Sequence, residues 1–262
     1  MVSYGIDKSA RNYSSSEGPH FAKLSHHTVH EHRENIRVVT YNIQYAKRIK
    51  KAVALIEKNK NLNHADIICL QEMDEQGVDD IACFLKYNYI YYPAVRHPKH
   101  NRNFGNAILS KYPIVAHEKT ILPYFDKRKL QRIAVSAMVN IGDCKIKVVC
   151  LHMKVFLKDI YRTMQVNRVM EIFSLGQKHC IIAGDFNTFT KKGYQASVNP
   201  LLESGFNLAT HNLGWNYRHW YLLNKKSALD HIFTKGFEVL HTGQVLSRKA
   251  SDHIPLWVEL KI

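Results

Sequence analysis

An acidic residue and an amide directly follow one short apolar run of this chain. Ile181 to Ala183 has the character of a strand buried on both faces, and Gly184-Asp185-Phe186-Asn187 comes next. Asp185 and Asn187 are two residues apart, so their side chains point the same way on an extended chain. A carboxylate beside an amide can hold a phosphate or a metal-bound water, because the amide donates without adding charge. Turn chemistry explains one such motif more simply.

Residues of the same kind adjoin five further apolar runs: Asn42, Glu72, His152, Asp230, and the pair Asp252 and His253. Each one alone is expected to be a cap, a turn or a buried polar group. Six such positions in one chain are hard to explain as turns. Together they indicate a shared functional site.

The residue types in this set favour metal-assisted hydrolysis of a phosphoester. Glu72 and Asp252 are hard oxygen ligands, which prefer Mg²⁺ or Mn²⁺, and Asn42 can ligate without adding charge. The two histidines and a further carboxylate can transfer protons. The sequence contains neither a glycine-rich phosphate loop nor a Gly-x-Ser-x-Gly motif. Nucleotide-driven phosphoryl transfer and serine hydrolysis are therefore disfavoured, which leaves metal-assisted hydrolysis.

The elements that must position these residues alternate between strands and helices. The expected helices are 48–58, 78–87 and 158–175, and 188–227 is expected to be largely irregular. The expected strands are 36–43, 66–72, 107–109, 114–116, 133–139, 145–151, a run beginning at 181, 229–233, 237–245 and 256–260. Two early strand–helix–strand units followed by paired strands predict a mixed sheet, or two packed sheets, flanked by helices.

Residues 1–35 are expected to form a flexible, His- and Ser-containing N-terminal extension, and 36–262 a single catalytic domain. The extension has no hydrophobic signal segment, and no apolar run is long enough for a membrane span. Its histidines are interpreted as incidental. Three of the five cysteines lie in apolar runs, which indicates free thiols in a reducing compartment. We therefore expect a cytoplasmic monomer; secretion by a non-classical route stays open.

The chain carries a formal net charge of +15, which favours a polyanionic partner, either nucleic acid or an anionic membrane surface. Solubility alone is the simpler explanation. Basic residues lie next to the motifs and predict a cationic rim: Arg96, Lys99, Arg102, Lys127, Arg128, Lys129, Lys191, Lys192, Lys225, Lys226, Arg248 and Lys249. The segment from Trp215 to Tyr221 interleaves aromatic and cationic residues. It suits base stacking, a membrane interface or the packing of a long loop.

Seven segments in this order resemble the motifs of the endonuclease/exonuclease/phosphatase (deoxyribonuclease I-like) superfamily: Thr40-Tyr41-Asn42-Ile43, Leu70-Gln71-Glu72, Gly105-Asn106-Ala107-Ile108-Leu109-Ser110, Cys150-Leu151-His152, Gly184-Asp185-Phe186-Asn187, Leu229-Asp230-His231-Ile232 and Ser251-Asp252-His253. The resemblance covers residues 36–262. It implies an α/β fold of four layers, an αββα sandwich of two mixed β-sheets flanked by helices. The site would lie at one end of the sandwich.

The resemblance also implies roles for the metal-binding and catalytic residues. Glu72 would be the principal ligand of Mg²⁺, with Asn42 and Asp252 at or near the metal. Asp230 would orient His253, which takes a proton or stabilises the phosphorane. The remaining catalytic positions are His152, near the leaving oxygen or the phosphate, and Asp185 and Asn187, which would position the attacking water and the phosphate.

Further residues are expected to contact substrate. Arg132 falls where members of the family often carry an arginine facing the phosphate, although a surface position on a strand is its alternative. The other expected phosphate- or substrate-binding residues are Asn106, Trp215, Tyr217 and Trp220. His231 points to the other face of its strand and is expected to be structural.

The resemblance leaves the substrate open, because the family cleaves DNA, RNA, phosphoinositides, sphingomyelin and protein–DNA adducts. The Pro-x-Trp-x-Asp-Arg element of inositol polyphosphate phosphatases is absent at Ser227 to His231. The continuation Ile43-Gln44-Tyr45-Ala46 also differs from that of abasic-site endonucleases. We therefore expect a Mg²⁺-dependent nuclease acting on DNA or RNA. A lipid phosphodiesterase or phosphatase at an anionic membrane, and a non-catalytic member of the fold, are the alternatives.

Overall fold

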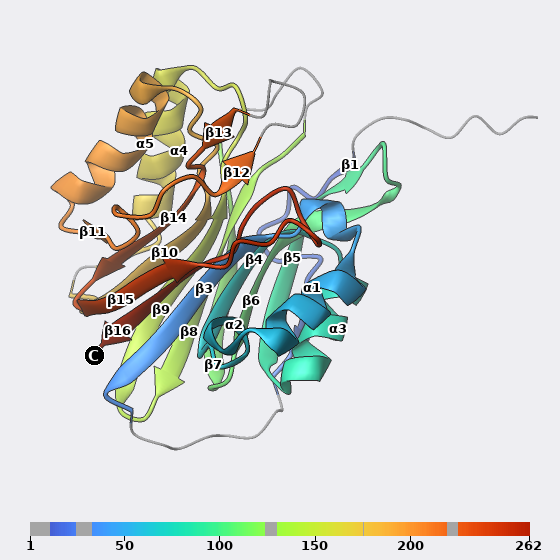
Figure 1. Cartoon of the computed structure of the whole chain (residues 1–262). Helices are drawn as coiled ribbons and strands as arrows, with labels where there is room; N and C mark the ends of the chain where they lie inside the picture. The colour runs from blue at the N-terminus through green and yellow to red at the C-terminus, as the bar shows by residue number, and fades with distance from the viewer. Residues whose placement is uncertain (1–10, 25–32, 124–129, 175, 219–224) are drawn as a thin grey trace, which may run out of the picture.

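Two β-sheets packed face to face form the centre of the molecule (Figure 1). The computed structural model describes residues 11–24, 33–123, 130–174, 176–218 and 225–262. None of the helices in these parts of the chain is long and apolar enough to cross a membrane.

The first sheet runs in the order β1-β5-β6-β4-β3-β16-β15, and β2 also pairs with β5. Strands β3 and β4 are parallel, and the other pairs of this sheet are antiparallel. Its strands are β1 (Arg11–Asn12), β2 (Phe21–Lys23), β3 (Asn35–Asn42), β4 (Ile67–Met73), β5 (Asn88–His97), β6 (Arg102–Ser110), β15 (Glu238–Gln244) and β16 (Leu256–Lys261).

The second sheet runs in the order β11-β14-β10-β9-β8-β7, and only β9 and β10 of its described strands are parallel. Its strands are β7 (Ile114–Ile121), β8 (Ile133–Ile141), β9 (Cys144–His152), β10 (His179–Asp185), β11 (Asn207–Leu208) and β14 (Asp230–Lys235). A short separate hairpin pairs β12 (Tyr217–Arg218) with β13 (Lys226–Ser227). Each sheet thus has one parallel pair, and in both cases helical segments connect its two strands.

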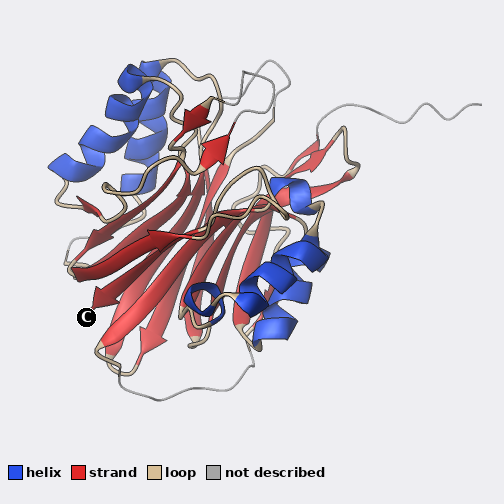
Figure 2. Cartoon of the chain, viewed as in Figure 1, coloured by secondary structure: helices blue, strands red, loops and turns tan. Residues whose placement is uncertain are grey.

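Helices cover the outer face of each sheet (Figure 2). Those over the first sheet are α1 (Ile49–Lys58), α2 (Lys60–Asn63) and α3 (Glu75–Leu85), and the 3₁₀ turn η1 (Gln44–Ala46) precedes them. Those over the second sheet are α4 (Asp159–Met170) and α5 (Lys191–Glu203). Asp74 and Thr190 begin α3 and α5 by accepting hydrogen bonds from the amides three residues later, at 2.9 and 3.0 Å. The four layers match the predicted αββα sandwich.

Three apolar clusters hold the layers together. The largest lies between the sheets and joins side chains such as Val38 and Ile108 of the first sheet to Val148 and Ile181 of the second. The other two lie under the two groups of helices. Since both faces of the central strands are buried, these strands consist of near-continuous apolar runs.

Several elements differ from the expectation from sequence. Strand β5 was not predicted, and α5 lies within the stretch that was expected to be irregular. Helix α4 also ends at Met170, five residues before the expected end. Strands β1 and β2 pair with β5, so residues 11–24 of the predicted flexible extension lie against the sheet. The boundary between extension and domain stays a prediction.

Candidate active site

The carboxyl ends of the two parallel strand pairs place four of the predicted residues at one end of the sandwich. Asn42 ends β3 and Glu72 is the second-last residue of β4. His152 and Asp185 end β9 and β10, where they are direct register partners. Ligand-binding residues in α/β sheets usually gather at such strand ends.

The backbone at these strand ends has conformations that ordinary strand residues avoid. Glu72 has a φ of 60° and Asn187 a φ of 52°, both in the left-handed region. Gly184 has a φ of 154°, and a Cβ there would lie 1.9 Å from the carbonyl oxygen of Leu151. Only glycine allows β10 to approach β9 this closely at the residue before Asp185.

Asp185 is buried at the centre of the site. Its Oδ2 accepts a hydrogen bond from Nδ2 of Asn42 at 3.0 Å, and its Oδ1 accepts one from the backbone amide of Asn187 at 2.9 Å. Nε2 of His152 lies 3.7 Å from Oδ2, and Nε2 of His253 lies 3.9 Å from it. Burial raises the pKa of Asp185 to about 7, against the opposing effect of His253. A carboxyl group with this pKa can exchange protons near neutral pH.

His253 and Asp230 form a buried pair, with Nδ1 of His253 2.7 Å from Oδ2 of Asp230. Burial alone would lower the pKa of His253, but the nearby carboxylates of Asp230, Asp185 and Asp252 together raise it to about 10. Asn216 positions the start of β14: its Oδ1 accepts from the Asp230 amide at 3.1 Å, and its Nδ2 donates to the Asp230 carbonyl at 2.8 Å. The carboxylate therefore fixes the imidazole and directs Nε2 toward Asp185.

Glu72 and Asp252 face the same small pocket, of about 160 Å³. Burial, followed by the charge of Asp252, raises the pKa of Glu72. Backbone and side-chain donors orient both carboxylates: the Tyr45 amide donates to Glu72 at 3.0 Å, and Nε2 of Gln44 donates to Asp252 at 3.0 Å. Two carboxylates that converge on one pocket, close enough for the charge of Asp252 to raise the pKa of Glu72, fit a hard divalent cation with Asn42 beside them.

A second group of possible ligands overlaps with the catalytic residues. Ligand atoms of Asp185, Asp230 and His253 lie within 4.8 Å of one another, which is close enough for one metal ion. However, His253 and Asp230 are already bonded to each other at 2.7 Å, and an imidazole suits a hard cation less well than an oxygen does. The predicted metal position at Glu72, Asp252 and Asn42 is therefore compatible with this geometry, and the roles of these residues stay predictions.

A sequence model of the endonuclease/exonuclease/phosphatase family matches residues 39–253, which contain every residue of this site. The chain belongs to this family. Members of the family hydrolyse phosphoester bonds, typically with a divalent metal ion. No curated protein sequence matches the chain.

Solved structures with the same fold support the assignment of the architecture. An endonuclease/exonuclease/phosphatase from Beutenbergia cavernae has 17% identity and a TM-score of 0.72, covering 88% of this chain and 72% of that one. D. rerio TDP2 complexed with single-strand DNA product has 14% identity and a TM-score of 0.72, covering 88% and 100%. The human Nocturnin catalytic domain with bound sulfate has 19% identity and a TM-score of 0.67, covering 88% and 94%.

His152 and Arg132 lie close to Glu72 in the same site. Nε2 of His152 is 4.0 Å from Glu72, and burial followed by the charge of Arg132 lowers the pKa of His152. The guanidinium of Arg132 lies over the Phe104 ring at 5.1 Å, and that ring lies 5.7 Å from His152. Arg132 is buried, so its alternative reading as a surface residue is wrong. Its contact with a phosphate stays a prediction.

The residues predicted to bind substrate lie at different depths. Tyr217 lines the pocket, with its ring 4.7 Å from that of His253. Asn106 is buried, and its amide donates to the backbone of Ile133 in the facing sheet at 2.9 Å. Trp215 contacts the ammonium group of Lys226 at 4.7 Å. Trp220 lies outside the described residues.

The sequence patterns did not identify several residues that support the site. Arg162 of α4 is buried and donates to the carbonyls of Phe186 and Asn187, at 2.9 and 2.6 Å. Phe156 and Phe189 line the pocket and stack on each other at 5.6 Å. One arginine in a predicted helix and two isolated phenylalanines form no sequence motif, so these residues could not be recognised. Asn216 lies inside the Trp215–Tyr221 segment and could have been found there.

His231 has the structural position predicted for it. Its buried ring packs against those of Phe186 and Tyr194, at 5.5 and 5.6 Å, on the face of β14 opposite the site. Burial lowers the pKa of His231 to about 4. The five cysteines are free thiols, and Cys69, Cys150 and Cys180 are buried as expected.

Proposed function

We propose that this protein is a Mg²⁺-dependent phosphodiesterase that cleaves DNA or RNA, with a preference for unpaired strands. The observation that carries the proposal is the convergence of Glu72, Asp252, Asp185 and the His253–Asp230 pair on one pocket. Carboxylates for a cation, a carboxyl with a pKa near 7 and an oriented imidazole are the groups that phosphodiester hydrolysis needs.

The side chains of the pocket divide the reaction between them. Glu72 and Asp252, with Asn42, would hold the cation, which when bound polarises the phosphate oxygens. Asp185 lies where it can hold the attacking water and accept its proton. The imidazole of His253, held by Asp230, donates a hydrogen bond to the phosphate as negative charge develops there.

Asn187 completes the arrangement around Asp185. Its Nδ2 donates to the Met153 carbonyl at 3.0 Å, which fixes the amide plane. The carbonyls of Asn187 and Phe186 accept from Arg162, which holds the loop after β10 against α4. These bonds are formed by the protein alone, so the site is preorganised.

Aromatic side chains at the pocket mouth support an unpaired nucleotide as substrate. Phe156 is 83% exposed, and its backbone φ of 53° is in the left-handed region. Its ring stacks on Phe189 with an interplanar angle of 25°. Phe189 in turn contacts the edge of Tyr217 at 6.2 Å. An exposed aromatic face beside the scissile phosphate suits base stacking. The single-strand DNA product in the TDP2 structure and the net charge of +15 support the same substrate class.

The exposure of Phe156 is also compatible with the alternative function, a lipid phosphodiesterase or phosphatase, because an exposed aromatic ring can enter a membrane interface. The deciding experiment is a panel of substrates with Mg²⁺: plasmid DNA, single-stranded RNA, abasic DNA, sphingomyelin and phosphoinositides. We expect cleavage of single-stranded nucleic acid, and Phe156→Ala should raise its KM about tenfold, the effect of one lost stacking contact. Turnover of a lipid but of no nucleic acid would overturn the proposal.

Three single substitutions test whether the pocket performs the reaction. We expect Glu72→Ala, Asp185→Ala and His253→Ala each to lower turnover by orders of magnitude with folding retained. Circular dichroism and the melting temperature check the fold. Full activity of all three variants would reject the catalytic assignment and favour a non-catalytic role.

A further inference from the structure

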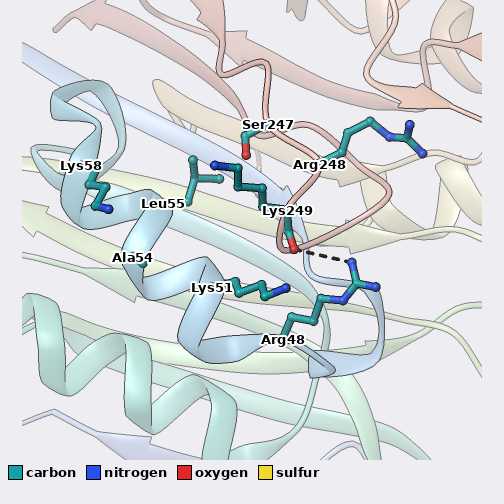
Figure 3. A pocket seen from close by; sticks show the side chains of 8 residues that line it. All are labelled: Arg48, Lys51, Ala54, Leu55, Lys58, Ser247, Arg248 and Lys249. Carbon is teal, nitrogen blue, oxygen red and sulfur yellow. Dashed lines mark hydrogen bonds between the residues drawn. The ribbon is translucent and has the colours of Figure 1, made fainter.

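A second pocket, of about 470 Å³, lies between α1 and the loop that precedes Asp252 (Figure 3). Arg48, Lys51 and Lys58 line one wall, and Arg248 and Lys249 line the other. The pocket that contains Glu72, Asp185 and His253 is called the catalytic pocket below. No described residue lines both it and the second pocket. It is therefore a separate cavity.

The lining combines positive charge with a small apolar floor. Lys51, Leu55 and Lys58 share one face of α1 because they are spaced by four and three residues. The side chain of Lys249 points toward Leu55 from the opposite wall, and those of Arg48 and Lys51 lie beside each other (Figure 3). The eight described lining residues include no acidic side chain. Nothing inside the pocket therefore neutralises its cations.

The shape of the pocket favours a compact ligand over a nucleic-acid strand. Nη1 of Arg48 donates to the carbonyl of Lys249 at 3.5 Å and joins the two walls. Nε2 of Gln44 donates to Asp252 at 3.0 Å and joins the same two segments again at the catalytic pocket. A continuous strand needs a groove that runs along the surface, whereas a half-open concavity of this volume, bridged by Arg48, suits one small molecule.

We propose that this pocket, defined by Arg48, Lys51, Lys58, Arg248 and Lys249, binds a compact ligand that carries several phosphate groups, either free or as a lipid headgroup. Lysine ammonium groups bind phosphates as point charges, and Arg48, which lies beside Lys51, adds a planar fork that matches phosphate oxygens (Figure 3). Ala54 and Leu55 contact the carbon skeleton of the ligand.

Such a ligand acts on the catalytic site through the loop between β15 and β16. Oγ of Ser251 donates to the Asn42 carbonyl at 2.6 Å and accepts from the His253 amide at 3.1 Å. The same loop carries Lys249, two residues before Ser251. A phosphorylated ligand that bridges α1 and Lys249 restrains the segment that presents Asp252 and His253. Occupancy is therefore expected to stabilise the protein and to alter turnover without occupying the catalytic pocket.

The test measures binding of inositol hexakisphosphate by calorimetry, without divalent cations, so that chelation of metal by the probe has no effect. Vesicles of phosphatidylcholine, with and without phosphatidylinositol bisphosphate, form a second arm. The variant is Lys51→Glu/Lys249→Glu, and the control is Lys50→Glu, which reverses an exposed charge on the same helix outside the pocket. Melting temperatures confirm that each variant folds.

We expect the double variant to lose about tenfold or more in affinity for the probe, whereas Lys50→Glu binds nearly as the unaltered protein does. Binding of the soluble probe identifies a free ligand; binding only to bisphosphate vesicles identifies a headgroup. If the double variant and the control lost the same affinity for the probe, the net charge of the protein would explain binding without the pocket. That result would overturn the proposal. So would normal probe binding by the double variant together with weaker oligonucleotide turnover, because the pocket would then serve the substrate strand. Loss of hydrolysis in Glu72→Ala tests the proposed function and leaves the binding result unaffected.

Discussion

The bond between Asp230 and His253 is the contact in the site that most directly links structure to catalysis. At 2.7 Å the carboxylate fixes the imidazole and raises its pKa. Asp230→Asn keeps the shape and removes the charge, so we expect kcat to fall by about 10²–10⁴ with KM little changed. Steady-state kinetics on an oligonucleotide measures this.

Asp80→Asn is the matched control for that change, because it removes an exposed carboxylate on α3 far from the pocket. It should leave kcat unaltered. If Asp230→Asn behaved like Asp80→Asn, His253 would not depend on its carboxylate partner.

Arg162 is expected to be a positioning residue, since it contacts the loop after β10 and not the pocket itself. Arg162→Met leaves the carbonyls of Phe186 and Asn187 buried without their donor, which should cost about 1–3 kcal/mol of unfolding free energy. We expect kcat to fall more than KM changes, and Arg162→Lys to restore part of kcat. Arg168→Met, which alters an exposed arginine of the same helix, should do neither. Equal stability of Arg162→Met and Arg168→Met in urea would contradict this.

Residue types and order were sufficient to predict that the polar strand ends would meet. The structure brings together Asn42, Glu72, His152, Asp185 and the Asp230–His253 pair, all inferred from their position next to apolar runs. Supporting residues such as Arg162 were not predicted, because their role depends on packing between α4 and β10 and has no signature in sequence. Phe156 was missed because a single phenylalanine in a loop has no signature in sequence.

At the scale of elements, the approach of β10 to β9 depends on Gly184. A Cβ at this position would collide with the backbone of Leu151 at 1.9 Å, so Gly184→Ala must move a strand end. We expect a loss of several kcal/mol of unfolding free energy and little remaining turnover, on the order of the largest single-residue effects. Gly176→Ala is the control: its φ of 87° is also positive, but nothing lies within 4 Å, so about 1–2 kcal/mol is expected. Similar melting temperatures for the two variants would contradict the close approach.

The N-terminal strands are held by Lys119 of β7. Its buried Nζ donates to the carbonyls of Tyr13 and Gly18, at 3.0 and 2.8 Å, and burial lowers its pKa from 10.5 to about 8. Between these pH values the unfolded chain binds more protons than the folded one, so this residue makes stability rise with pH. Compared with Lys119→Met, the unaltered protein should gain unfolding free energy from about pH 8 to about pH 10.5, by at most about 1.4 kcal/mol per pH unit.

Urea denaturation at several pH values measures that difference. Tyrosines that titrate in the same pH range contribute equally to the unfolding free energy of both proteins. Their contribution therefore cancels in the difference. If the difference in unfolding free energy stayed constant or shrank as the pH rose, burial would not lower the pKa of Lys119 in the folded protein.

The two longest elements that escaped prediction, β5 and α5, both have weak sequence patterns. Strand β5 (Asn88–His97) is buried on both faces and contains Pro93, so it lacks both alternation and an uninterrupted strand pattern. Helix α5 contains Gly193 and Pro200, and Gly193 and Ser197 are among its buried residues, so its apolar stripe is weak. In contrast, β3, β4 and β10 are apolar runs that end in a polar residue, and this combination was predictable.

For the whole molecule, the four-layer architecture is shared with structures of 14–19% identity, so the fold tolerates replacement of most of its residues.

The net charge of +15 is the property of the whole molecule that favours a polyanionic partner. We expect the dissociation constant for a single-stranded oligonucleotide to rise steeply with salt, with a log–log slope of about 0.7 for each phosphate contacted. Fluorescence anisotropy at several salt concentrations measures it. Affinity that is independent of salt would mean that the charge serves solubility alone. The expected monomeric state and cytoplasmic location stay predictions.

The most direct test of the account is the Mg²⁺ dependence of oligonucleotide hydrolysis by the unaltered protein and by Glu72→Gln. We expect saturable activation by Mg²⁺ and no activity with excess chelator. In Glu72→Gln we expect turnover lower by about 10²-fold or more with a raised Mg²⁺ requirement. Undiminished hydrolysis in chelator, or a Glu72→Gln variant with the normal Mg²⁺ requirement and turnover, would contradict the account.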